Sequence, residues 1–160
     1  MNKKDNRGPL AASKKRKGLP PSRRQEAAVS LLRTKDYLRR FCSGVFEQNG
    51  ITSQQYNVLR ILRGAGSRGL PTLDIVERMI EQTPGITRLL DRLEEKKLVR
   101  RERPPDDRRQ VFCFVTAKGV DLLSAMDAPV LQKANEALQK LSDPEVKELI
   151  TLLARVRGET

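Results

Sequence analysis

The sequence predicts a mainly α-helical fold with one small β-hairpin. From residue 24 onward, apolar residues recur mostly at three- and four-residue spacing, which is the period of amphipathic helices. Within residues 98–116, two short β-prone runs flank a charged, proline-containing tip, as expected for a surface hairpin. An amphipathic helical pattern comes immediately before that hairpin. A helix followed by an arginine-tipped hairpin can engage neighbouring grooves of DNA, so this order predicts a winged helix.

Length and charge are compatible with a DNA-binding protein. A chain of 160 residues can form one domain with a core, or a DNA-binding domain with dimerisation helices. Lys and Arg total 32 against 20 Asp and Glu, and a charge of +12 favours a polyanionic partner. Most of this excess lies in residues 1–24, where nine Lys or Arg accompany one acid, Asp5. The remaining chain is only mildly basic, so the net charge alone does not establish DNA binding.

The residue types argue against an enzyme, a metal site and a cofactor. The chain has no histidine, and Cys42 and Cys113 are too far apart in sequence to suggest a zinc site or a disulfide framework. It also lacks a glycine-rich phosphate loop. No apolar run approaches the roughly 20 residues of a membrane span, and the basic N-terminus lacks the apolar stretch of a signal peptide. We therefore expect a cytoplasmic, non-enzymatic protein.

Residues 1–22 form a basic tail that we expect to be disordered. Lysine and arginine are interspersed there with glycine and proline, and such a stretch buries too little apolar surface to fold. Two interpretations stay open for this tail. It is either a solvated leader or an arm that adds non-specific contacts to DNA phosphates.

Two helices are predicted next. Apolar spacing indicates a long helix over residues 24–48, which an Asn-Gly pair ends. Thr52 and Gln55 then have the spacing of a capping box, so a second helix follows and ends at residues 64–66.

A helix-turn-helix pattern follows. Its first helix covers residues 72–79, and Thr83 and Pro84 suit the N-cap and the first position of its second helix. The apolar stripe of the second helix consists of Ile86, Leu89, Leu90 and Leu93. The opposite face presents Gly85, Thr87, Arg88, Asp91 and Arg92. Because the second helix of such a motif lies in the major groove, this polar face is predicted to meet DNA.

Two further helices are predicted after the hairpin. Thr116 can cap a helix that starts near Ala117, and Pro129 is expected to kink or interrupt it. A second capping box at residues 142–145 opens the last helix.

Four motifs occur in order along the chain. They are Thr52-x-x-Gln55-x-x-Val58-Leu59, the run 87–94, Leu98-Val99-x-Arg101, and Asp107-x-Arg109 followed by Val115-Thr116-x-x-Gly119. Together they resemble the second helix, the recognition helix and the wing of the MarR family of bacterial transcriptional regulators, over about residues 30–157. The chain departs from the family pattern at Lys97, where a glycine is usual, so a non-glycine residue is expected to adopt a left-handed conformation. The turn inside the helix-turn-helix also lacks the usual glycine.

The resemblance implies a homodimeric transcriptional regulator, most often a repressor, on a pseudo-palindromic operator. Its fold would be mainly α with a small β-hairpin wing, a winged helix-turn-helix with N- and C-terminal dimerisation helices. After the tail, the implied parts are an N-terminal dimerisation helix (23–50), a DNA-binding domain (51–117) and C-terminal dimerisation helices (118–160). A small-molecule effector between the dimerisation helices and the DNA-binding domain is a further implied partner.

Arg88 and Arg92 are candidates for base contact, because they lie one turn apart on the polar face of the recognition helix. Arginine can donate two parallel hydrogen bonds to guanine. The alternative is an ion pair with Asp91 or Glu95 on a solvated helix. Hydroxyls and backbone N–H groups at a helix start suit phosphate oxygens. The predicted contacts there are Thr83, Pro84, Gly85 and Thr87.

In the hairpin tip, Arg109 is the candidate for insertion into the minor groove. The resemblance implies that Asp107 holds the Arg109 guanidinium by a charge-assisted pair. Arg108 is expected to contact phosphate. The alternative is a surface hairpin with an ordinary ion pair.

Other functions stay open. Some members of the family sense oxidants through cysteine, but Cys42 falls on an apolar helix face and Cys113 in the second hairpin strand. Both are therefore predicted to pack as small hydrophobic side chains. A winged helix that contacts another protein and a nucleoid-type protein that relies on the tail are the remaining candidates.

Overall fold

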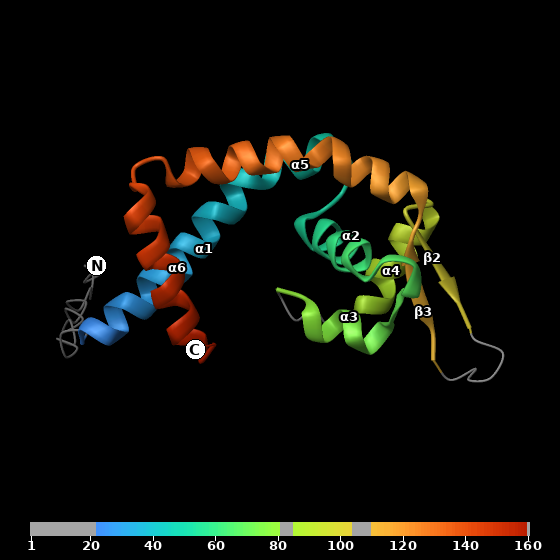
Figure 1. Ribbon diagram of the computed structural model, residues 1–160, viewed down its shortest axis with the longest axis horizontal. Helices are drawn as coiled ribbons and strands as arrows, with labels where there is room; N and C mark the ends of the chain where they lie inside the picture. The colour runs from blue at the N-terminus through green and yellow to red at the C-terminus, as the bar shows by residue number, and fades with distance from the viewer. Residues whose placement is uncertain (1–21, 81–84, 104–109, 160) are drawn as a thin grey trace, which may run out of the picture. The chain divides into compact units, whose positions relative to one another are not determined.

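The computed structural model describes residues 22–80, 85–103 and 110–159 (Figure 1). In chain order its elements are α1 (Arg23–Gln48), α2 (Ser53–Ala65), the 3-10 helix η1 (Gly66–Arg68), β1 (Leu70–Pro71), α3 (Thr72–Arg78), α4 (Ile86–Glu95), β2 (Val99–Glu102), β3 (Phe112–Val115), α5 (Ala117–Leu138) and α6 (Asp143–Arg157). The predicted fold class, mainly α with a small β wing, is confirmed. None of the described helices is long and apolar enough to cross a membrane.

The hydrophobic core lies after residue 34, whereas residues 23–34 of α1 are all exposed. Helix α2 packs against α3, α4 and α5 and against β3. Its Leu59 and Leu62 have no exposed surface, and neither has Leu93 of α4. These side chains belong to the apolar stripes that the sequence predicted, because an amphipathic helix buries one face. The described part of residues 51–117 is called the winged lobe below.

The wing is part of a three-stranded antiparallel sheet in the order β1-β3-β2. Strands β2 and β3 pair along their whole length, with Val99 opposite Val115 and Arg101 opposite Cys113. Strand β1 joins the other side of β3 through Leu70, which also lies opposite Cys113. The sequence did not indicate β1, because two residues are too short for a recognisable alternation of apolar and polar positions. The arrangement leaves β2 at the edge of the sheet.

Helix caps that were predicted from sequence are confirmed. The Thr52 hydroxyl accepts from the Gln55 N–H at 3.2 Å, and the Gln55 side-chain oxygen accepts from the Thr52 N–H at 3.0 Å. A second capping box opens α6, and Thr116 caps α5 by accepting from the Gly119 N–H at 3.1 Å. These side chains satisfy backbone donors that have no partner inside the helix. The predicted helix starts at these sites therefore hold to within one residue.

Two local predictions were wrong. Helix α4 begins at Ile86 with Gly85 as its N-cap, not with Thr83 as cap and Pro84 in the first position. Gly85 has a φ of 100°, which glycine adopts without a Cβ clash. Pro129 was expected to kink or interrupt its helix, and the interruption is wrong, because helix α5 runs through Pro129. It continues because Met126 on one side and Val130 on the other pack on the same core, which offsets the hydrogen bond that proline removes.

Candidate nucleic-acid interface

Helix α4 separates a buried apolar face from an exposed polar one. Leu89, Leu90 and Leu93 are buried, and Ile86 is partly buried against them. The exposed residues on the other side are Gly85, Thr87, Arg88 and Arg92. This division follows from the 3.6-residue period of the helix. The structure thus places together four of the nine residues that the sequence assigned to DNA contact.

The other five predicted contact residues, Thr83, Pro84, Asp107, Arg108 and Arg109, lie outside the described residues.

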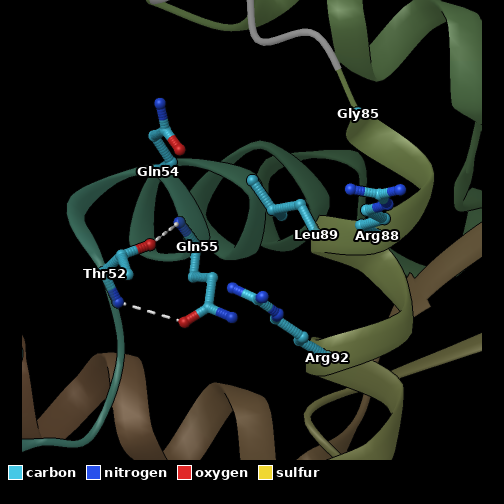
Figure 2. A pocket seen from close by; sticks show the side chains of 7 residues that line it. All are labelled: Thr52, Gln54, Gln55, Gly85, Arg88, Leu89 and Arg92. Atoms are coloured by element: carbon cyan, nitrogen blue, oxygen red, sulfur yellow. Dashed lines mark hydrogen bonds between the residues drawn. The ribbon is translucent and has the colours of Figure 1, made fainter.

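A cleft of about 460 Å³ lies between α4 and the start of α2 (Figure 2). Arg92 extends from α4 toward Thr52 and Gln55, whereas Arg88 lies one turn earlier along the same helix. The lining residues are Thr52, Gln54, Gln55, Gly85, Arg88, Leu89 and Arg92. Arg88, Arg92 and the positive end of the α2 dipole therefore line one open space, which suits an anionic group such as phosphate.

The carboxylate nearest to both arginines in sequence is engaged elsewhere. Asp91 accepts a hydrogen bond from Arg101 of β2 at 2.7 Å through its Oδ1. In the described ranges, no ion pair joins Arg88 or Arg92 to Asp91 or Glu95. The solvated-pair alternative for these two residues is therefore not supported. The sequence did not predict that Arg101 pairs with Asp91, although Arg101 belongs to one of the four motifs.

A tight turn connects α4 to the wing. Lys97 has a φ of 60°, so the predicted left-handed conformation at a non-glycine residue is confirmed. The Thr116 hydroxyl donates to the Lys97 carbonyl at 2.8 Å, while the Leu98 carbonyl accepts from the Thr116 N–H at 3.1 Å. A Cβ on Gly119 would come within 2.4 Å of the Leu98 carbonyl oxygen, so only glycine fits there. The turn, the wing and the start of α5 are thus held close together.

Both cysteines are packed in apolar surroundings. Cys113 is fully buried, and Cys42 is partly buried against the core. Burial raises the pKa of each thiol, so both stay protonated at neutral pH. Because the thiolate is the reactive form, this environment favours packing over oxidant sensing. Among the described residues, no cluster of His, Cys, Asp or Glu could hold a metal ion.

A smaller and more apolar groove of about 180 Å³ lies beside the end of α3. Met79 and Ile80 form one wall, and Ile80 is 84% exposed. The Ile80 N–H donates to the Asn57 side chain of α2 at 3.1 Å. The remaining lining residues are Lys35, Arg39, Ser53 and Gln54. No sequence signal pointed to this groove, because its residues come from separate parts of the chain.

Comparisons with known proteins agree with the geometry. The MarR family model matches residues 51–111. The HTH-type transcriptional regulator MhqR of Bacillus subtilis is 30% identical over 109 residues, which is 68% of this chain and 74% of that protein. The MarR transcription factor of Planctomyces limnophilus has a crystal structure with a TM-score of 0.67 and 40% identity, over 82% of this chain and 96% of that one.

A crystal structure of a mutant MarR from Escherichia coli, complexed with operator DNA, shares the fold. Its TM-score is 0.74 at 24% identity, over 82% of this chain and 93% of that one. The predicted family is therefore confirmed by the sequence match and by the architecture. The chain belongs to the MarR family, whose members are DNA-binding transcriptional regulators and not enzymes.

Proposed function

We propose that the protein is a homodimeric repressor that binds a pseudo-palindromic operator through α4 and the wing. One observation carries the proposal for DNA contact. Arg88 and Arg92 are exposed one turn apart on α4, and neither pairs with a carboxylate in the described part of the chain. Such guanidinium groups on the second helix of a helix-turn-helix are suited to guanine edges in the major groove.

Residues at the start of α4 are proposed to contact the phosphate backbone of DNA and so to position this helix in the groove. Gly85 and Thr87 are exposed there, and a Cβ at Gly85 would meet nothing within 4 Å. The open surface lets a phosphate approach the N–H groups of the first turn. Thr83 and Pro84 precede this turn, and we assign them to the same phosphate contact.

The wing tip is proposed to enter the minor groove. Strand β2 ends at Glu102 and β3 begins at Phe112, so the tip belongs to the segment that joins them. Arg109 would insert, Asp107 would hold its guanidinium, and Arg108 would contact phosphate.

The homodimer is supported by apolar side chains that the described chain leaves uncovered. Helix α6 has no buried residue, and Ile150 and Val156 are 61% and 71% exposed. Leu131 of α5 is 62% exposed. Exposed apolar residues that recur on one helix mark an interaction surface. We assign it to a second copy of this chain, as the two-fold symmetry of a palindromic operator requires.

A small effector is proposed for the apolar groove beside α3. Met79 and Ile80 offer apolar contact, and the positively charged Lys35 and Arg39 also line the groove, Arg39 while donating to Asp36 at 2.8 Å. These groups fit an aromatic carboxylate. Because Ile80 lies shortly before α4 in the chain, an occupant would act close to the recognition helix. Added aromatic acids should then release the protein from operator DNA in a mobility-shift titration.

Selection of bound sites from random DNA tests the proposal. A dimeric regulator should enrich a palindrome and lose affinity steeply with salt, with a slope of about −0.9 per phosphate contacted. A reporter that carries the enriched site over its promoter should be repressed. Weak binding with no preferred sequence would instead indicate a protein-binding winged helix. Loss of binding only on deletion of residues 1–22 would indicate a nucleoid-type protein.

A further inference from the structure

Arg101 connects the wing to the recognition helix. Its Nε donates to Glu94 Oε2 at 2.8 Å, and one Nη donates to Asp91 Oδ1 at 2.7 Å. Its backbone N–H also donates to Glu94 Oε1 at 3.2 Å. The side chain is 25% exposed, so water screens this pairing only partly. The two carboxylates hold the pKa of Arg101 above its already high value, so the residue is charged at any physiological pH.

The position of Arg101 makes these bonds mechanically important. Strand β2 lies at the edge of the sheet and has β3 on one side only. The Arg101 N–H at that edge finds its acceptor on α4, not on another strand. Strand β2 leads directly into the hairpin tip, so its orientation against α4 influences where the tip lies relative to the recognition helix. Bonds made to the carboxylates of Asp91 and Glu94 therefore fix the two DNA-contacting parts of the lobe as one unit.

The same bonds affect the charge of the DNA-facing helix. Asp91 lies between Arg88 and Arg92 in sequence, and three residues is a spacing at which helical side chains meet. Asp91 accepts from Arg101 through Oδ1, and among the described ion pairs none joins Asp91 to Arg88. Without Arg101, the carboxylate would be available to Arg88 and would also repel DNA phosphates. Arg101 in the wing thus leaves the guanidinium of Arg88 on the recognition helix available to contact DNA.

We propose that Arg101 is a positioning residue that sets the wing against the recognition helix and keeps Asp91 away from Arg88. This inference rests on the proposed function, because it assumes that α4 and the wing contact separate grooves of one operator. It predicts that loss of Arg101 changes how the lobe binds DNA more than whether the lobe is folded.

The test compares Arg101→Gln with wild type in the full chain on the selected operator. Arg101→Gln should lower operator affinity at least about tenfold, as expected for loss of a partly buried charged pair. Hydroxyl-radical footprints should lose the flanking minor-groove protection and keep the central protection. Arg100→Gln on the same strand is the matched control, because Arg100 lies over the Phe114 ring and does not contact α4 carboxylates. It should leave both protections in place.

A charge exchange separates positioning from mere stability. Arg101→Glu should bind more weakly than Arg101→Gln, and adding Glu94→Arg to it should recover at least part of the affinity and the flanking protection. Asp91→Asn with Glu94→Gln provides a second route if the Arg101 variants do not fold, and should also lose flanking protection. If the wild type gives no flanking protection, the proposed function fails. If wild type gives both protections and Arg101→Gln keeps both, or loses both in parallel with its thermal stability, the positioning role is overturned.

Discussion

The winged lobe and helix α6 differ in how far their apolar side chains are buried. In the lobe, Leu59, Leu62 and Leu93 have no exposed surface. Helix α6 is amphipathic and well capped, yet none of its residues is buried. Burial of apolar surface is the main stabilising term of a fold, so the lobe is stabilised by a core that it shares with the end of α1 and with α5, whereas α6 contributes no buried residue. The lobe thus has its apolar side chains covered within this chain, and α6 has an apolar face that suits a partner.

The ion pairs of the winged lobe and of α6 also differ, both in their burial and in the distance along the chain that they connect. In the lobe, Arg101 joins strand β2 to α4 with one partly buried side chain and two carboxylates. The ion pair described at the end of α6 is local, between Arg157 and Glu159, and both side chains are more than half exposed. Exposed local pairs contribute little to stability. The polar contacts of α6 therefore do not replace the missing burial.

The largest effect is expected from a cavity in the lobe. Leu93→Ala should lower the free energy of unfolding by about 2–5 kcal/mol, because it removes fully buried methyl groups. The matched change, Leu152→Ala in α6, removes the same atoms from a side chain that is 46% exposed. Its effect should be smaller and should shrink further as the protein is diluted. Urea denaturation at several protein concentrations measures both, and equal losses at every concentration would contradict the comparison.

The next effect concerns the partner of α6. Ile150→Asp combined with Val156→Asp should weaken dimerisation by at least about 100-fold, because burying two carboxylates without partners is costly. Sedimentation velocity should then show monomers, while the winged lobe keeps its thermal transition. Lys147→Glu changes an exposed residue of the same helix and is the control. A double variant that remains dimeric would show that α6 is not the dimer interface.

A smaller effect is expected from the wing tip. Arg109→Ala should weaken operator binding at least about tenfold, or 1.4 kcal/mol, because a minor-groove cation is lost. Dimerisation and thermal stability should not change, since the residue is proposed to act only on DNA. Arg103→Ala, at an exposed position just beyond strand β2, is the control in the mobility-shift titration. Unchanged affinity of the Arg109 variant would remove the wing from the mechanism.

The smallest effect tests backbone strain in the lobe. Lys97→Gly should raise the free energy of unfolding by up to about 1 kcal/mol, because glycine removes the Cβ penalty at a φ of 60° but adds chain entropy to the unfolded state. Thermal denaturation measures the change. Operator affinity should not decrease. A loss of stability would mean that the Lys97 side chain contributes more than its backbone costs.

Several features of this protein could be predicted because their causes are local in sequence. The capping boxes at Thr52 and Ser142 join residues three positions apart, so residue identity alone indicates the helix start. The apolar stripe of α4 and the hairpin strands follow from side-chain period. The polar face with Arg88 and Arg92 follows from the same period, since a buried stripe defines its opposite side.

Other features depended on contacts between distant residues. Strand β1, the passage of α5 through Pro129 and the cleft between α2 and α4 each need a neighbour that sequence spacing does not reveal. The placement of Gly85 as N-cap was also missed, because Thr83 and Pro84 are the residue types preferred at an N-cap and at the first helical position.

Residue identity and spacing were sufficient to specify most helices, their caps, the hairpin and the family. Only the folded arrangement showed that Asp91 pairs with Arg101 instead of a neighbour on its own helix, and that the described chain leaves the apolar face of α6 uncovered. The two groups of features differ because the interactions that cause them act over different distances along the chain. Backbone caps and side-chain period act within one or two turns, whereas ion pairs between elements and buried area exist only after the chain has brought its elements together.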